Sequence, residues 1–376
     1  MGKEIGTYSF FGEFVYEQIV PRDHFLMKLN QVVKWERLTK RLIRYYRGKG
    51  KVGRPPYDPV VLLKMLFISY LYDLSERQAE EAVSYNLVIK AFIGLRVDER
   101  APDATTLSVF KRRLLEGGGL KALEGIFQEV LVMAQRQGIK LGEIQIIDSV
   151  HSIADVNTEK EVRRRKKGEL PRDPNARWGV SLQDPVGKGT KRVTDEKGRS
   201  RKEKEYFYGY KQHVSLNAET GLITSLRFSP GSAYDGHFLP PLIESDLEQG
   251  VPVGIVAADR GYDDGENHEF LRQKGTASAI HLNRYRTQKK DKDKESWVEM
   301  KSSPQCQKAV KERRRIEAKL GEMKGSHGLR RCRYLGLLRY ALQGYFTALV
   351  VNLKRILLLL MGVRFRPLAK ATCGGV

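Results

Sequence analysis

Two aspartates occupy positions where side chains commonly meet a ligand. Asp148 ends a short β-branched run that begins at Glu143, and Asp259 ends an apolar run that begins at Val253. Ligands gather at the carboxyl ends of strands in open α/β sheets. Two carboxylates brought together there repel one another unless a cation neutralises them, and such hard oxygen ligands suit Mg²⁺ or Mn²⁺. Taken alone, each aspartate is better interpreted as an ordinary loop or helix-capping residue.

A third acid, Glu317, lies in a predicted helix. Arg313, Glu317 and Lys324 are separated by 4 and 7 residues, which places them on one stripe of that helix. The adjoining stripe, expected to pack on a sheet, is apolar: Ile316, Leu320 and Met323. A glutamate between two cations suits a site that binds both metal and phosphate. The alternative is a surface Arg–Glu pair, which contributes almost nothing to stability.

The elements that must position these acids form a mixed α/β pattern. After the strand that ends at Asp148, the expected elements in chain order are a hairpin (208–216 and 222–228), a helix (236–249), a strand (253–258), a helix (265–274), a strand (277–282) and a long helix (307–324). Alternation of this kind predicts a mixed sheet covered by helices. Asp235 is interpreted as the cap of the helix that follows it.

The first 140 residues have a helical pattern. Asp58 precedes Pro59 as an N-cap, Ser75 opens a capping box with a helix to about Ala91, and Asp103 or Thr105 caps a third helix. This third helix is expected to expose a basic face, namely Lys111, Arg112 and Arg113. Such a module either docks on a duplex or serves oligomerisation and packing.

The charge balance favours a polyanionic partner. Lys and Arg exceed Asp and Glu by 67 − 45 = 22, and the excess is spread along the chain. Lys and Arg that neutralise phosphates release condensed counterions, so nucleic acid is the expected partner. The polar stretch near 159–205 is especially basic and is interpreted as a flexible, strand-poor insertion that either contacts DNA or is merely solvated.

Cysteine usage and hydropathy point to a cytoplasmic protein. The 3 cysteines are scattered without a CxxC pair, which suits a reducing compartment. No apolar signal-peptide core follows the first residue. The most apolar segment, 345–361, contains Asn352, Lys354 and Arg355, and the apolar residues from Leu338 to Leu357 recur at helical spacing. A buried core helix is therefore expected, and no membrane association.

Several motifs together resemble a known family. The segment Arg313-x3-Glu317-x6-Lys324 continues into Gly-Ser-His-Gly-Leu-Arg-Arg331, and Ala-Asp259-Arg-Gly-Tyr-Asp and Ile-Ile-Asp148-Ser supply the two aspartates. The chain resembles the DDE transposases of bacterial insertion sequences with a Tyr-x2-Arg-x3-Glu-x6-Lys signature. The resemblance extends from about residue 50 to 355, and its N-terminal part is similar to those enzymes' helical module. One position departs from the signature, because Val310 stands where it has tyrosine.

The resemblance implies both a fold and an activity. Residues 141–365 would form an RNase H-like mixed sheet catalytic domain, with a basic insertion near 159–205, and residues 1–140 an all-helical N-terminal domain for DNA-end recognition. Asp148, Asp259 and Glu317 would hold Mg²⁺ or Mn²⁺ for two-metal phosphodiester hydrolysis and strand transfer.

The resemblance also implies partners. Double-stranded DNA, as terminal inverted repeats and as target, would be bound by a homodimer in the cytoplasm, in association with the nucleoid. The expected DNA-binding residues are Arg313, Lys324, Arg330, Arg331 and Lys211.

Three alternatives stay open. A tyrosine recombinase would use His327-x-x-Arg330 with a downstream tyrosine, Tyr334, Tyr340 or Tyr345, but it requires no aspartates at strand ends. A catalytically inactive DNA-binding protein derived from a transposase would keep the basic surfaces alone. An RNase H-like nuclease for branched DNA or RNA leaves the helical N-terminal module without a purpose.

The charge excess makes a testable prediction. Affinity for duplex DNA should fall steeply as salt concentration rises, because each phosphate contact releases counterions and contributes about −0.9 to the slope of log K against log salt. Fluorescence anisotropy of a labelled duplex titrated over a range of salt concentrations measures that slope. A flat response would contradict a phosphate-dominated interface.

Overall fold

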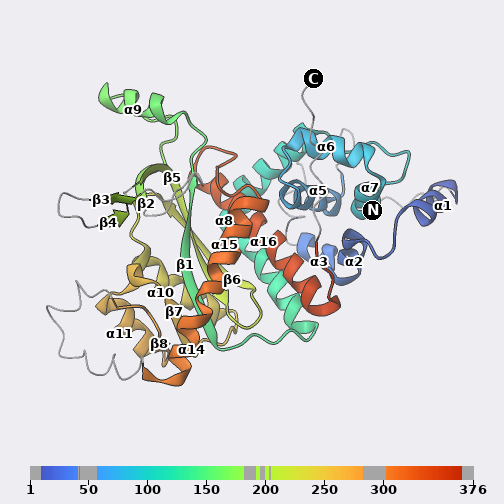
Figure 1. Cartoon of the computed structure of the whole chain (residues 1–376). Helices are drawn as coiled ribbons and strands as arrows, with labels where there is room; N and C mark the ends of the chain where they lie inside the picture. The colour runs from blue at the N-terminus through green and yellow to red at the C-terminus, as the bar shows by residue number, and fades with distance from the viewer. Residues whose placement is uncertain are drawn as a thin grey trace. The chain divides into compact units, whose positions relative to one another are not determined.

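The computed structural model describes residues 10–40, 42, 57–181, 192–194, 200–202, 205–282 and 302–365 (Figure 1). The chain divides into two compact units, one formed by Met1–Gly118 with Val350–Val376 and the other by Gly119–Leu349. The divisions fall inside two helices, α8 (Ala104–Arg136) and α16 (Leu337–Met361). Gly119 within α8 has φ 54° and ψ −143°, so the helix is kinked there.

The regular elements described in the first unit are all helices. Its elements are α1 (Phe10–Ile19), α2 (Phe25–Val32), α3 (Trp35–Lys40), α5 (Pro59–Leu71), α6 (Glu76–Tyr85), α7 (Leu87–Ile93), the start of α8 and the end of α16. In its core, the Trp35 ring meets the rings of Phe67 and Phe92 edge-on at 5.6 Å each. Lys64 donates to the Phe92 carbonyl at 2.9 Å, and burial lowers the pKa of Lys64 to about 8.

The predicted helix starts are confirmed. Asp58 accepts from the Val60 amide at 2.7 Å, Ser75 and Gln78 form the capping box, and Asp103 accepts from the Thr106 amide at 2.6 Å. The extent predicted for the second helix is wrong. It ends at Tyr85, because Asn86 takes an extended conformation and caps a separate helix, α7.

The basic face expected on the third helix is only partly present. Arg112 and Arg113 are exposed, but Lys111 is buried and forms an ion pair with Glu76. Lys111 therefore joins α8 to α6 inside the unit, and the prediction that it lies on an exposed face is wrong.

The second unit is built on a mixed sheet. Its main strands are β1 (Ile144–Ile153), β2 (Arg177–Ser181), β5 (Glu205–Asn217), β6 (Ile223–Pro230), β7 (Ile255–Ala258) and β8 (Ala277–Ser278). The order is β2-β5-β1-β7-β8, with β6 also paired to β5. β5 runs antiparallel to β1 and β6, whereas β7 and β8 are parallel to β1. A hairpin beside parallel strands is the predicted RNase H-like α/β fold, which the structure confirms.

Helices cover both faces of this sheet (Figure 1). On one face, α10 (Leu239–Glu248) and α11 (Gly265–Gln273) bury Ile147, Val256 and Ala258. On the other, Ser152 of β1 contacts the Tyr340 hydroxyl of α16 at 3.0 Å, and the Tyr210 and Tyr340 rings stack at 4.9 Å. Because side chains alternate along a strand, the even-numbered residues of β1 face α16 and the odd-numbered ones face α10.

The long helix predicted for 307–324 is two helices. These are α14 (Pro304–Glu312) and α15 (Arg314–Ser326), which meet at Arg313. The apolar stripe is confirmed, since Ile316, Leu320 and Met323 are buried and α15 packs along β1. The stripe thus determines which side of the helix Arg313 and Glu317 occupy.

The basic stretch near 159–205 contains more regular structure than expected. It begins with α9 (Thr158–Lys166), and β2 within it pairs with β5 in the main sheet. β3 (Arg192–Thr194) and β4 (Ser200–Lys202) form a small antiparallel pair. The prediction of a strand-poor insertion is therefore wrong for these segments, while residues 182–191, 195–199 and 203–204 lie outside the described part.

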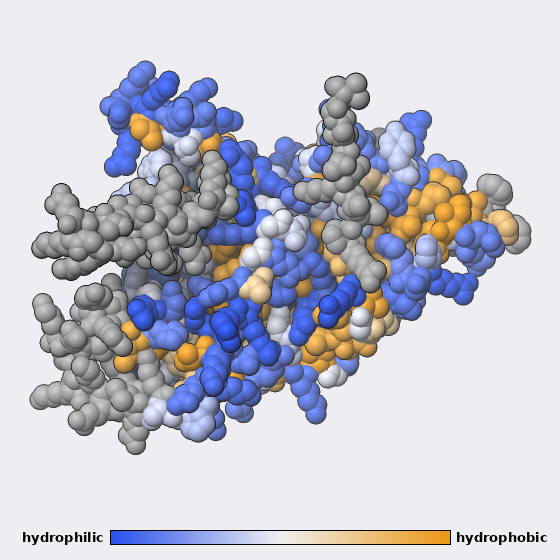
Figure 2. All heavy atoms as spheres, in the orientation of Figure 1, coloured by the Kyte–Doolittle hydropathy of each residue, from blue (hydrophilic) through white to orange (hydrophobic). Residues whose placement is uncertain are grey.

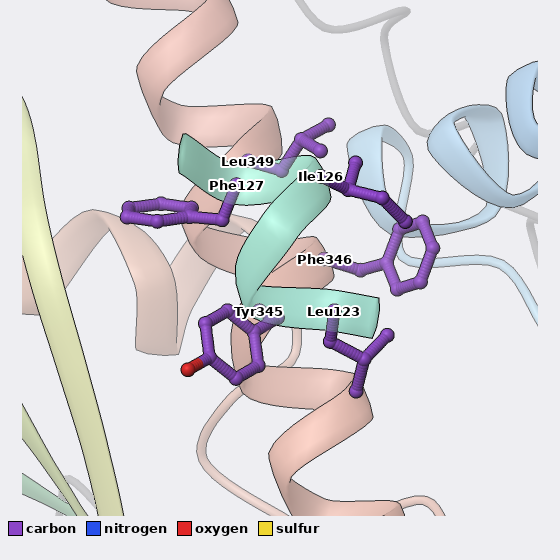
Figure 3. A pocket seen from close by; sticks show the side chains of 6 residues that line it. All are labelled: Leu123, Ile126, Phe127, Tyr345, Phe346 and Leu349. Carbon is purple, nitrogen blue, oxygen red and sulfur yellow. The ribbon is translucent and has the colours of Figure 1, made fainter. Parts of the chain in front are cut away.

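α16 is the one described helix long and apolar enough to cross a membrane, and 67% of its most apolar window is buried in the structure. That burial is typical of a core helix. Within the second unit it meets α8 at a small apolar pocket (Figure 3), lined by Leu123, Ile126, Phe127, Tyr345, Phe346 and Leu349. Leu338 alone departs from the expected buried stripe, with 40% exposure.

The close packing of β5 against β1 predicts a sharp stability effect at Gly209. A Cβ atom there would meet the Ser152 carbonyl oxygen, a backbone atom that cannot move aside. Gly209→Ala should lower the free energy of unfolding by roughly 1–3 kcal/mol, as overpacking does. Urea denaturation measures the change. Gly265→Ala, where the added methyl group meets nothing within 4 Å, is the control and should be neutral or stabilising. Equal effects of the two substitutions would contradict the packing argument.

Candidate active site

Parallel pairing brings Asp148 and Asp259 to the same level of the sheet. β1 and β7 pair as far as Ile147 with Ala258, so these two aspartates are the next residues on adjacent strands. Asp259 follows the end of β7, as predicted. Asp148 does not end its strand, because β1 continues to Ile153 through its pairing with β5, so that part of the prediction is wrong. At Asp148 the backbone is held by β5, where it pairs with Val214, and the pairing with β7 ends one residue earlier.

The Asp148 carboxyl lies in an environment that disfavours its charge. Burial raises its pKa to about 7, and the neighbouring Asp259 carboxylate adds to this effect. The Ser149 amide, which donates to Asp148 at 2.8 Å, and the Arg313 guanidinium oppose the shift. A carboxyl that is partly protonated near neutral pH beside a second carboxyl is a position where a cation would bind strongly.

Asp259 is held by the turn that follows it. Its carboxylate accepts from the Gly261 amide at 2.8 Å and caps the short 3-10 helix η2 (Arg260–Tyr262). A Cβ atom at Gly261 would lie 2.9 Å from the same oxygen, so glycine permits this close approach. Asp259 can therefore cap this turn and also bind a metal ion, because one carboxylate oxygen accepts from Gly261 and the other does not take part in the cap.

Glu317 forms an ion pair with Arg313. The guanidinium donates to Glu317 at 3.0 Å, and 22% of the Arg313 side chain and 54% of the Glu317 side chain are exposed. The same guanidinium lowers the pKa of Asp148. Arg313, at the α14–α15 junction, therefore compensates charge for an acid on the helix and for an acid on the sheet.

Asp235 belongs to the same acidic neighbourhood. It raises the pKa of Asp148, and its carboxylate accepts from Ser149 Oγ at 3.1 Å and from Lys211 Nζ at 2.9 Å. The prediction that Asp235 caps a helix is wrong, because the 3-10 helix η1 (Asp235–Phe238) begins after Tyr234 and has no side-chain cap. Residues 231–234 separate Asp235 from the end of β6, whereas Asp259 directly follows β7, so a place at a strand end does not mark Asp235 as a site residue.

Tyr262 lies beneath the carboxylates. Its side chain is 1% exposed, and the Ser149 side chain lies beside the buried hydroxyl. Burial raises the pKa of Tyr262 well above its usual value, and Asp148, Asp235 and Asp259 raise it further. This phenol remains neutral and can serve as a donor to a carboxylate.

The predicted DNA-binding residues occupy three different surroundings. Lys211 is largely buried against Asp235 and the Ala233 carbonyl. Burial lowers the pKa of His151, and the nearby Lys324 lowers it further. Arg330 accepts through its backbone carbonyl from the Ile153 amide at 3.0 Å.

Arg331, next in the chain, is 58% exposed and pairs with Asp155 at 3.4 Å. Arg331 therefore presents a cation at the surface near the end of β1, whereas Lys211 compensates charge inside the site.

The donor set suits a divalent cation in kind, because aspartate and glutamate oxygens are the ligands that Mg²⁺ and Mn²⁺ prefer. The structure brings Asp148 and Asp259 together and holds Glu317 against Arg313. Over the described residues, no group of three His, Cys, Asp or Glu side chains is placed to share a metal ion. The two aspartates thus fit a metal, and the glutamate is oriented toward a different cation.

Two known domains match the chain. Residues 14–113 match the transposase domain DUF772, and residues 162–353 match the transposase DDE domain. The second match spans about half of the chain and includes Asp235, Asp259 and Glu317.

Among solved structures, the chain is similar to the piggyBac transposase in a synaptic complex with hairpin DNA, with 12% identity, a TM-score of 0.40 and coverage of 87% of this chain and 71% of that one. It is also similar to the Mos1 mariner paired-end complex with Mn, with 12% identity, a TM-score of 0.21 and coverage of 86% and 93%. The family assignment comes from the domain matches: the chain belongs to the DDE transposases, enzymes that generally use divalent metal ions.

Proposed function

We propose that this transposase cuts and joins DNA at the ends of a bacterial insertion sequence, by phosphodiester hydrolysis followed by strand transfer. The observation that carries the proposal is the pairing of β1 with β7, which sets the Asp148 and Asp259 carboxyls on adjacent strands at one level. We also propose that it belongs to the Tyr-Arg-Glu-Lys signature type, with Val310 in the place of the tyrosine.

Asp148, Asp259 and Glu317 are the proposed metal ligands, and Mg²⁺ or Mn²⁺ the proposed ion. When bound, divalent cations would supply activation of the attacking water or 3′-hydroxyl and relief of charge on the leaving oxygen. Asp148 must give up its proton for this role, and Tyr262 remains a neutral neighbour. Glu317 must exchange its contact with Arg313 for the site that the aspartates form.

A DNA phosphate is the group that would bring about this exchange. The Arg313 guanidinium binds a carboxylate in the structure, and the same planar fork of donors suits a phosphate. Arg313, Lys324, Arg330 and Arg331 are proposed to hold the DNA backbone. The sequence predicts the same role for Lys211, but its pairing with Asp235 makes a supporting role for that acid the better proposal.

The proposed partner is double-stranded DNA, as terminal inverted repeats and as target, bound by a homodimer at the nucleoid in the cytoplasm. We assign recognition of the ends to the helical N-terminal part, expected at residues 1–140, and catalysis to residues 141–365. The excess of 22 basic over acidic residues favours such a partner.

A catalytically inactive DNA-binding protein is the second candidate function. One observation favours it: in the described residues the three acids do not converge as a ready metal site. The two candidates differ in one property, which is metal-dependent strand cleavage.

Neutralising each acid tests the catalytic proposal. Asp148→Asn, Asp259→Asn and Glu317→Gln should each lower Mg²⁺-dependent nicking of DNA that carries the element's own ends by at least about a hundredfold, because each substitution removes a charged ligand. Binding of the same DNA in EDTA should persist. Gel analysis of end-labelled DNA measures nicking, and anisotropy measures binding.

Glu322→Gln is the control, because Glu322 lies on the same helix and pairs with Lys319 at 3.1 Å. This variant should cleave as the unaltered chain does. Normal cleavage by any of the three test variants removes that acid from the site, and no cleavage by the unaltered chain favours the inactive binding protein.

The raised pKa of Asp148 predicts a pH dependence. A folded-state pKa of about 7, above the ordinary value of 3.8, gives stability that is present at low pH and is lost as pH rises through 7. Without metal, Asp148→Asn should therefore stabilise the protein at about pH 8 by up to a few kcal/mol, and the gain should shrink towards pH 4. Urea denaturation at several pH values in EDTA measures this difference.

The same group links metal to protons. Near pH 6.5, Mg²⁺ binding should release a proton from the unaltered chain and none from Asp148→Asn, because only the deprotonated carboxylate is a ligand. Calorimetry in buffers of different ionisation enthalpy counts the protons. Equal proton release by both proteins would show that Asp148 does not titrate with metal.

A further inference from the structure

α9 carries a dense run of exposed cations outside the proposed catalytic site. Its last turn and the residue after it contain five basic side chains, all exposed: Arg163, Arg164, Arg165, Lys166 and Lys167. Arg164 approaches Glu161 at 3.9 Å. Across the described parts of the chain, the other four form no ion pair with a carboxylate, so their charge is available to an external partner.

The fold fixes α9 without using these cations. Asn157 caps the helix by accepting from the Lys160 amide at 3.1 Å. Glu161, the one buried residue of α9, accepts from the Arg172 amide at 3.2 Å and so ties the helix to the following segment. A basic residue near a helix C-terminus contributes only about 0.3–1 kcal/mol, and adjacent like charges repel. Five consecutive cations therefore exceed what the helix itself needs.

α9 lies beyond the end of the strand that carries Asp148. From Asp148 to Ile153, β1 spans about 17 Å at roughly 3.3 Å per residue, and α9 follows it in the chain after residues 154–157. Figure 1 shows α9 standing away from the sheet, and Figure 2 shows hydrophilic residues over the same corner. Arg331, which bridges to Ile153 and pairs with Asp155, lies between the two.

The length of this strand segment can be compared with a duplex. The roughly 17 Å from Asp148 to Ile153 equals about half a helical turn of B-DNA, which is about 34 Å long and carries one phosphate charge per about 1.7 Å of axis. We propose that α9 binds the phosphate backbone of duplex DNA more than about half a turn away from the phosphate that is cleaved. The proposal rests on the proposed function, because it takes the aspartate site as the place of cleavage.

The test measures binding by the full-length chain in EDTA, so that cleavage does not interfere. The probes are duplexes that carry the element's end and extend either about 6 or about 20 base pairs past the cleavage point, on one side or the other. The variant replaces Arg163, Arg165, Lys166 and Lys167 with glutamine, which removes four charges and keeps helix propensity. Circular dichroism checks that it is folded.

The variant should bind the long extension on one side at least about tenfold more weakly than the unaltered chain does. The slope of its log K against log salt should be less negative by about 0.9 for each phosphate that the variant no longer neutralises. Its affinity for the short extensions should be unchanged. Arg272→Glu with Lys274→Glu, which also changes the charge by four and lies at the end of α11, is the control and should not depend on extension length.

The outcomes separate this proposal from the proposed function. If the unaltered chain binds the duplexes and the α9 variant binds every length equally well, α9 has no role in DNA binding and only this proposal fails. If the unaltered chain fails to bind any duplex, the proposed function fails, and this proposal fails with it.

Discussion

The parallel pairing of β1 with β7 is the constraint on which the site depends. It places two aspartates at the same level of the sheet, each directly after the last paired residue of these two neighbouring strands. Their mutual repulsion, together with burial, is visible in the raised pKa of Asp148. The apolar core formed by Ile147, Val256 and Ala258 below them holds the strands in this register. Core packing therefore stabilises an arrangement that electrostatics alone would oppose.

Basic and hydrogen-bonding side chains offset this repulsion. Arg313 serves Glu317 and Asp148, while Lys211 and Ser149 serve Asp235. Arg313 thus contacts or faces two proposed metal ligands, and Lys211 and Ser149 contact Asp235, which lies beside one of them. These contacts offset the repulsion between the acids in the folded protein when no ligand is bound. The Arg313 guanidinium, which binds a carboxylate here, is also proposed to bind a DNA phosphate.

The remaining positive charge is placed outside the sheet. Basic side chains at the surface, such as those of α9 and Arg331, contribute little to stability, since exposed ion pairs are worth at most about 1 kcal/mol. Their value lies in association, because counterion release strengthens binding to a polyanion. Buried apolar contacts therefore stabilise the fold, whereas exposed basic residues such as those of α9 are the ones available to bind a polyanion.

Local sequence signals determined much of this protein. Apolar periodicity and capping residues located the strand before Asp259, the hairpin, the buried stripe of α15 and the start of α5, because these signals depend on neighbours within a few residues. Strand ends and helical spacing indicated Asp148, Asp259 and Glu317, and the resemblance to DDE transposases selected these three as the candidate set.

Only the tertiary structure decided the rest. It carried β1 past Asp148, broke the long helix at Arg313, buried Lys111 and brought Asp235 beside Asp148. Three of these outcomes come from partners that are distant in the chain, namely β5 for β1, Glu76 for Lys111 and Asp148 for Asp235, and local periodicity carries no information about such partners.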